Sequence, residues 1–95
     1  MRQEEFVIIK NFEYLGKFPK NIVLKHGEDE DREWYDFVKR RKAIVIKRNK
    51  HVKPSYFFIF IISGNTVRTL HGAYLKVRDA VKYLEKLGFK VTIEK

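Results

Sequence analysis

The sequence predicts an α+β fold, in which an antiparallel sheet of four to six strands carries two helices. Three observations favour this class: short apolar runs of strand length, turn-forming residues between them, and one long amphipathic segment near the C-terminus. The 95 residues are 44% hydrophobic and include no cysteine. This apolar content predicts one domain, residues 1–95, that folds around its own core without a disulfide or a structural metal.

The strand predictions rest on runs of β-branched and aromatic residues bounded by charged or turn-forming residues. We expect strands at residues 6–9, 22–24, 43–46, 56–62, 67–70 and 89–93, with the second pairing back on the first. The run 56–62 is apolar on both faces, which predicts a central strand with a layer on each side. Tyr56, Phe58, Phe60 and Ile62 point one way and Phe57, Ile59 and Ile61 the other, and for part of one of these faces the candidate layers are the N-terminal aromatic segment, a second subunit or stacked bases.

The first helix is expected between two charged clusters. It begins at the acidic segment 27–31, because carboxylates in a first turn suit the positive end of the helix dipole, and it ends in the cationic run 39–42. Trp34, Phe37 and Val38 then share one face of this helix.

The second helix is expected at about residues 73–87, where apolar positions recur with helical spacing. Gly88 follows as a left-handed cap that places Phe89 to pack back on Leu84. The C-terminal strand then alternates apolar and polar residues, which is typical of a half-exposed strand.

Positive charge is concentrated in the middle of the chain. The formal net charge is +9, and positions 37–78 hold eleven Lys and Arg residues and no Asp or Glu. Such a local excess favours a polyanion partner, because each neutralised phosphate releases a counterion. The predicted nucleic-acid contacts lie on the first helix end, the following hairpin loop and the last helix: Lys39, Arg40, Arg41, Lys42, Lys47, Arg48, Lys50, His51, Lys53, Lys76 and Arg78.

This charge distribution also has two interpretations that need no ligand. Acid at the start and base at the end of a helix both suit its dipole, so helix electrostatics alone accounts for each cluster. The second interpretation is a solvated charged face of a heat-stable protein, because the composition is rich in Lys, Glu, Ile and Val like that of proteins from hot environments. The lack of acidic residues within 37–78 favours the polyanion, because heat-stable surfaces usually mix both signs.

The sequence offers little for catalysis or metal binding. The three histidines share no ligand spacing, so we expect no metal and no cofactor. A nuclease that holds Mg²⁺ on Asp29, Glu30 or Asp31 is an alternative, but consecutive carboxylates on a helix point in different directions. The start of the chain has no signal-peptide pattern, and the longest uncharged stretch, 54–67, is too short to cross a bilayer. We therefore expect a non-enzymatic, cytoplasmic protein with no membrane partner.

Two stretches resemble nucleic-acid-binding families. His51 with Tyr56, followed by the run FIFIISG, is similar to the histidine loop and second strand of double-stranded-RNA-binding domains, but residues 74–76 (Tyr-Leu-Lys) replace the paired lysines that open their last helix. The runs FVIIKNF and KPSYFFIF are similar to the two sheet motifs of RNA-recognition domains, with a longer spacing and without the glycine of the second motif. Both likenesses imply a nucleic-acid partner.

The function predicted from the sequence is binding to DNA or RNA through phosphates, without sequence selectivity. The alternative is a protein-interaction or structural module, in which the strand at 56–62 supports a homodimer and the basic stretch binds an acidic protein.

Overall fold

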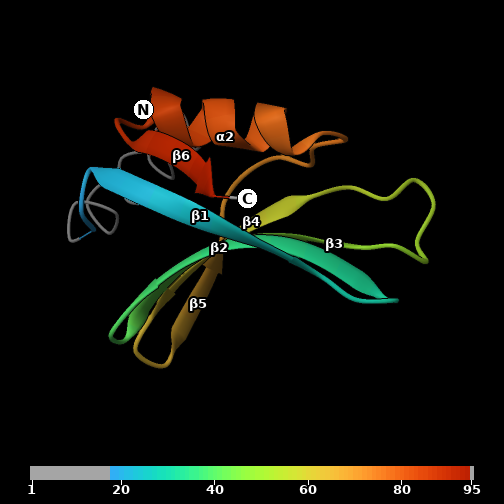
Figure 1. Cartoon of the computed structure of the whole chain (residues 1–95), viewed down its shortest axis with the longest axis horizontal. Coiled ribbons are helices and arrows are strands. Elements are labelled where there is room, and N and C mark those ends of the chain that lie inside the picture. Colours follow the sequence, from blue (N-terminus) through green and yellow to red (C-terminus); the bar gives the residue numbers. More distant parts are fainter. Residues whose placement is uncertain (1–17, 95) are drawn as a thin grey trace, which may run out of the picture.

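The computed structural model describes residues 18–94, which form one sheet and one helix (Figure 1). The elements in chain order are β1 (Asn21–Glu28), β2 (Arg32–Lys39), β3 (Lys42–Asn49), β4 (Phe58–Ser63), β5 (Thr66–Thr69), α2 (Val77–Lys86) and β6 (Lys90–Glu94). The α+β class is therefore confirmed, and the strand expected at 6–9 lies outside the described residues.

The sheet has six strands in the order β5-β4-β3-β2-β1-β6. The strands β1 to β5 form an antiparallel meander in which each strand pairs with the next. The chain then crosses through α2, and β6 adds to the outside of β1 in parallel. The sheet is thus mostly antiparallel, with one parallel pair at its edge.

The prediction of the first helix was wrong, because the segment between residues 27 and 42 forms strand and turns instead, so residues 18–94 contain one helix. The carboxylate of Asp29 accepts the backbone N–H groups of Asp31 and Arg32 at 2.8 and 2.7 Å, so the acidic cluster makes a tight turn. The strand β2 that follows is rich in aromatic residues, which favour strands. Neither the helix–meander–helix order of double-stranded-RNA-binding domains nor the βαββαβ order of RNA-recognition domains occurs within residues 18–94.

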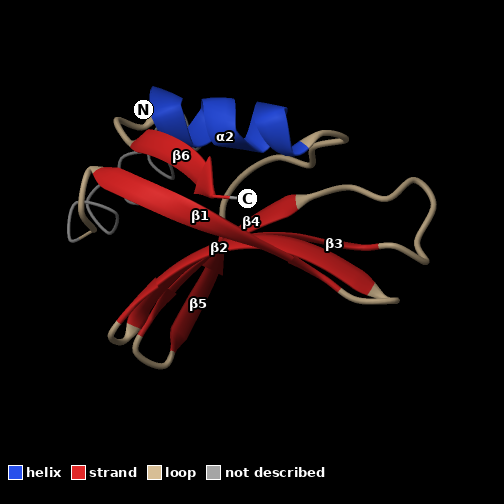
Figure 2. Cartoon of the chain, in the orientation of Figure 1, coloured by secondary structure: helices blue, strands red, loops and turns tan. Residues whose placement is uncertain are grey.

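The helix α2 covers one face of the sheet (Figure 2). Alternate residues of β1, β3 and β4 point toward it, and Ala80 and Leu84 of α2 are fully buried against them. The sheet residues with no more than 1% exposure in this core are Ile22, Leu24, Ile44, Ile46, Ile59 and Ile61.

The opposite face of the sheet, here called the open face, has no described element packed on it. Its apolar side chains keep large exposed fractions, such as 65% for Val38, 61% for Val67 and 39% for Phe58. The alternation predicted for residues 56–62 is confirmed, because Phe57, Ile59 and Ile61 are buried while Tyr56 and Phe58 are exposed. The expected layer on each side of that strand is not observed, since α2 covers a single face.

The C-terminal end of α2 follows the prediction. Gly88 has a φ of 109°, which L-residues rarely adopt, and its N–H donates to the Glu85 carbonyl at 3.0 Å. The N–H of Phe89 donates to the Leu84 carbonyl at 3.2 Å, and both side chains belong to the core. The helix is shorter than expected at its start, because Tyr74 forms an isolated β-bridge with Phe57.

Candidate nucleic-acid interface

The predicted contact residues divide between the two ends of β3. The run from Lys39 to Lys42 forms the β2–β3 turn, whereas residues 50–53 lie in the β3–β4 loop. At about 3.3 Å per residue, the eight residues of β3 separate these two clusters by roughly 26 Å. The single surface predicted from a helix end and a hairpin loop therefore does not form, and the two clusters must be considered apart.

The β2–β3 turn carries the first cluster at an exposed tip. Arg40 has a φ of 56°, and Lys39 pairs with Lys42 across the hairpin. The β4–β5 turn lies beside it, because the Gly64 N–H donates to the Arg41 carbonyl at 2.8 Å. The two turns appear together at the lower left of Figure 1.

A groove of about 880 Å³, here called the tip groove, lies beside these turns. The described residues that line it include four cations and no Asp or Glu. They are Phe18, Pro19, Phe37, Lys39, Arg40, Arg41, Lys42, Ser63 and Gly64. This composition gives the groove a positive potential that suits an anionic ligand.

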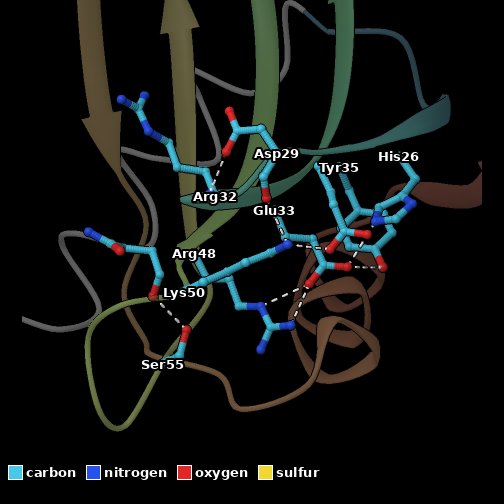
Figure 3. A network of polar contacts seen from close by, with 10 residues as sticks. His26, Asp29, Arg32, Glu33, Tyr35, Arg48, Lys50 and Ser55 are labelled. Atoms are coloured by element: carbon cyan, nitrogen blue, oxygen red, sulfur yellow. Dashed lines mark hydrogen bonds and ion pairs between the residues drawn. The ribbon is translucent and has the colours of Figure 1, made fainter.

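Two cations at the β3–β4 loop end of the sheet, Arg48 and Lys50, are paired with carboxylates of β2 and β1 (Figure 3). Arg48 contacts Glu33 at 2.6 Å. Lys50 contacts Glu28 at 2.6 Å, and its ammonium also donates to the Asp29 carbonyl at 2.8 Å. These contacts, together with the His51–Asp31 contact at 2.7 Å, are called the loop network here. A phosphate would have to compete with carboxylates for these cations.

Glu33 is the centre of the loop network. It accepts from Arg48 Nε at 2.8 Å and contacts His26 Nε2 at 2.8 Å, and the His26 ring stacks on Tyr35 with centroids 4.5 Å apart. Burial alone would raise the pKa of Glu33, but the contacts with His26 and Arg48 outweigh it and hold this pKa below its usual range. Burial, followed by the charge of Glu33, raises the pKa of Tyr35.

A second groove, here called the face groove, opens where the β3–β4 loop meets the open face. Its volume is about 430 Å³, and no Asp or Glu of the part of the chain that the structure describes lines it. The lining residues are Arg32, Lys47, Arg48, Asn49, Val52, Pro54, Tyr56, Phe58 and Phe60. The Lys47 ammonium lies over the Phe60 ring, 5.0 Å from its centroid. Cations and partly exposed aromatic rings therefore share one concave surface.

Arg32 and its neighbour Trp34 were missed by the sequence analysis as contact candidates. Both were placed in the expected helix, where they would not share a face with Lys47. The strand register instead pairs Trp34 directly with Lys47, and Arg32 lies two residues away on the same face. A strand period over residues 32–38 was the signal that could have found them.

The remaining predicted contacts line neither groove. Lys53 is exposed in the β3–β4 loop, and Lys76 and Arg78 are exposed at the start of α2. Lys76 occupies the N-cap position, where a cation does not stabilise the helix because that end of the helix dipole is positive. Their use by a ligand stays a prediction.

No group of three or more His, Asp or Glu residues within residues 18–94 is arranged to hold a metal ion. Asp29 is engaged in its turn, and its bonds to the backbone N–H groups of Arg32 and Asp31 lower its pKa. None of the described helices has the length and apolar character needed to cross a membrane.

Comparisons with protein-family models, curated proteins and solved structures found no match.

Proposed function

We propose that this chain is a non-enzymatic nucleic-acid-binding protein whose main phosphate contacts come from the β2–β3 turn. The observation that carries the proposal is the acid-free cluster at this tip. Lys39, Arg40 and Arg41 are exposed and have no ion pair within residues 18–94. Their charges are therefore available to a ligand without the loss of an internal contact.

The physics of phosphate binding favours this cluster over the loop network. When a hydrated cation that has no ion pair in the free protein binds a phosphate, the counterion released from the nucleic acid contributes in full to the binding free energy. Arg48 and Lys50 would first have to leave Glu33 and Glu28, which costs part of that gain. Two of the three available cations are arginines, whose planar guanidinium binds phosphate oxygens in a bidentate manner.

The test compares two double variants with the same change in net charge. Arg40→Asn with Arg41→Gln removes two of the four positive charges of the β2–β3 turn, and Asn tolerates the positive φ of residue 40. Lys82→Gln with Lys86→Gln removes two exposed charges from α2, which line neither groove. Affinity for fluorescent single-stranded and duplex oligonucleotides is measured by anisotropy between about 50 and 200 mM salt.

We expect the tip variant to weaken binding to all sequences alike and to reduce the slope of log affinity against log salt by about 1.4 to 1.8. This range corresponds to two lost contacts, at about 0.7 each for single strands and about 0.9 each for duplexes. The α2 variant should retain the parental slope. An equal loss of affinity in both variants would show that binding depends on net charge and not on the β2–β3 turn. No binding of any oligonucleotide at low salt would end the proposal.

A protein-interaction module is the second candidate, and the open face is the observation that favours it. Val23, Val38 and Val67 are 46%, 65% and 61% exposed on this face, and contiguous apolar surface often marks an interface. In this case the open face forms a homodimer and the tip binds an acidic protein. Light scattering distinguishes the two, because this candidate requires a stable dimer at micromolar concentration.

A further inference from the structure

We propose that the nucleic acid bound is single-stranded and that its bases stack on Tyr56 and Phe58 in the face groove. This inference rests on the proposed function and adds to it a ligand class and a second binding site. The tip groove contributes phosphate contacts, whereas the face groove contributes contacts to the bases.

The first argument is the exposure of the two rings. Tyr56 and Phe58 are 37% and 39% exposed, while Phe57 between them is 4% exposed in the core. Tyr56 and Phe58 therefore lie on the outer side of the sheet, where no described element covers them. Base stacking on such rings is tolerant of sequence, because every base has a π-face.

The second argument is the charge around the rings. Lys47 lies over Phe60, Arg32 lines the same groove, and no carboxylate is among the lining residues. A backbone phosphate can thus bind beside a stacked base in a groove that no described carboxylate lines, while Asp29 and Asp36 line the adjoining hollow. Charge complementarity favours nucleic acid here over a second copy of this chain, which would bring its own Lys47 and Arg32 to the interface.

The third argument concerns the form of the nucleic acid. In a duplex the base faces are stacked on one another, and only their edges are accessible in the grooves. An aromatic ring on a sheet can stack only on a base that is free of its duplex partner, as in a single strand or a loop. The groove volume of about 430 Å³ is within the range of small-ligand pockets, so it can hold a single flat ring system beside the aromatic side chains.

Trp34 provides a built-in probe of this site. It is the one tryptophan of the chain, it pairs across the strands with Lys47, and it lines the adjoining hollow with Arg32 and Lys47. The indole lies close against Gly27, since a Cβ at that glycine would come within 2.4 Å of the ring nitrogen. A ligand that binds Arg32 or Lys47 in the face groove should therefore change the Trp34 fluorescence, because these two cations line both hollows.

The experiment titrates the protein with an oligothymidylate single strand and with a duplex of the same length, reading both anisotropy and Trp34 emission. The test variants are Tyr56→Leu and Phe58→Leu, which keep an apolar side chain but remove the π-face. Val23→Ala is the control, because it removes exposed apolar surface from the same face outside the groove. Circular dichroism melts confirm that each variant is folded.

We expect the single strand to bind more tightly than the duplex and to quench Trp34, and each aromatic variant to weaken single-strand binding by at least about fivefold. Binding to the duplex should not change in these variants, and Val23→Ala should behave as the parent. Equal affinity for both forms, with no effect of the aromatic variants, would overturn this inference but leave the proposed function intact. A dimer in light scattering whose Trp34 is shielded from quenchers would also overturn it, and no binding to either form would overturn both proposals.

Discussion

At the scale of single residues, Glu33 connects three strands. Its carboxylate on β2 contacts His26 from β1 and Arg48 from β3, and the Tyr35 hydroxyl donates to it at 3.4 Å. Its side chain is only 12% exposed, so these contacts are less screened by water than those of the outer pairs. The carboxylate therefore holds the β3–β4 loop end of the sheet together.

The lowered pKa of Glu33 predicts a loss of stability in acid. The folded protein holds this carboxyl deprotonated more strongly than the unfolded chain does, so its contribution is complete above the unfolded value of about 4.5. The contribution is then lost as the pH falls through the lower folded value. We expect Glu33→Gln to reduce the free energy of unfolding at pH 7 by about 1 to 2 kcal/mol and to flatten its decline between about pH 5 and pH 3.

Urea unfolding at a series of pH values measures this effect. Glu30→Gln is the matched control, because it makes the same chemical change at an exposed turn position outside the loop network. If the two variants show the same pH dependence, the network around Glu33 does not contribute to acid stability.

At the scale of elements, the hairpin β2–β3 shows where sequence reasoning reached its limit. Tyr35 and Phe37 face the core and Trp34 faces the open side, so apolar residues occupy both faces of β2. A segment with this pattern fits a helical period and a strand period equally well. The acidic cluster also fits both a helix start and a tight turn, and only the pairing with β1 and β3 decides between them.

The elements with one clear period were predicted well. In α2 the apolar positions recur only with helical spacing, and Gly88 marks its end. The alternation over residues 56–62 correctly separated the core side from the outer side. The candidate site was predicted only in part, since the charge of Arg48 and Lys50 was recognised, but their carboxylate partners Glu33 and Glu28 lie on β2 and β1, far from them in the sequence. Such long-range pairing leaves no local signal in the sequence.

The cap of α2 allows a clean test of backbone conformation. Gly88 has a φ of 109°, and an added Cβ would meet no atom within 4 Å. The cost of Gly88→Ala is therefore backbone strain alone, which we expect to lower the free energy of unfolding by about 1 kcal/mol. Lys86→Ala in the last turn serves as the control, and an equal loss in both variants would contradict this assignment.

At the scale of the whole molecule, the charges are polarised along the sheet. At the end with the β2–β3 turn, Lys39, Arg40 and Arg41 have no acidic partner among the described residues, whereas at the end with the β3–β4 loop Arg48 and Lys50 are paired with carboxylates. An uneven field of this kind orients an approaching polyanion before contact and speeds association at low salt. The tip groove would then meet the ligand first.

The parallel pairing of β6 with β1 joins the last described strand of the chain to the first. Lys90 pairs with Asn21, and Ile93 pairs with Leu24 of the core. We expect a variant that lacks residues 88–95 to lose cooperative unfolding, because β1 then becomes an unpaired edge and the packing of Phe89 on Leu84 is lost. Thermal melts followed by circular dichroism measure this, and a sharp transition in the truncated chain would show that the meander is stable alone.

This pairing also bears on how the protein is made. During translation, β6 cannot pair with the outer edge of β1 until residues 90–94 have left the ribosome. Until then the described strands leave this edge of β1 without its partner β6, and an open strand edge is a surface that chaperones protect and that other nascent chains can pair with.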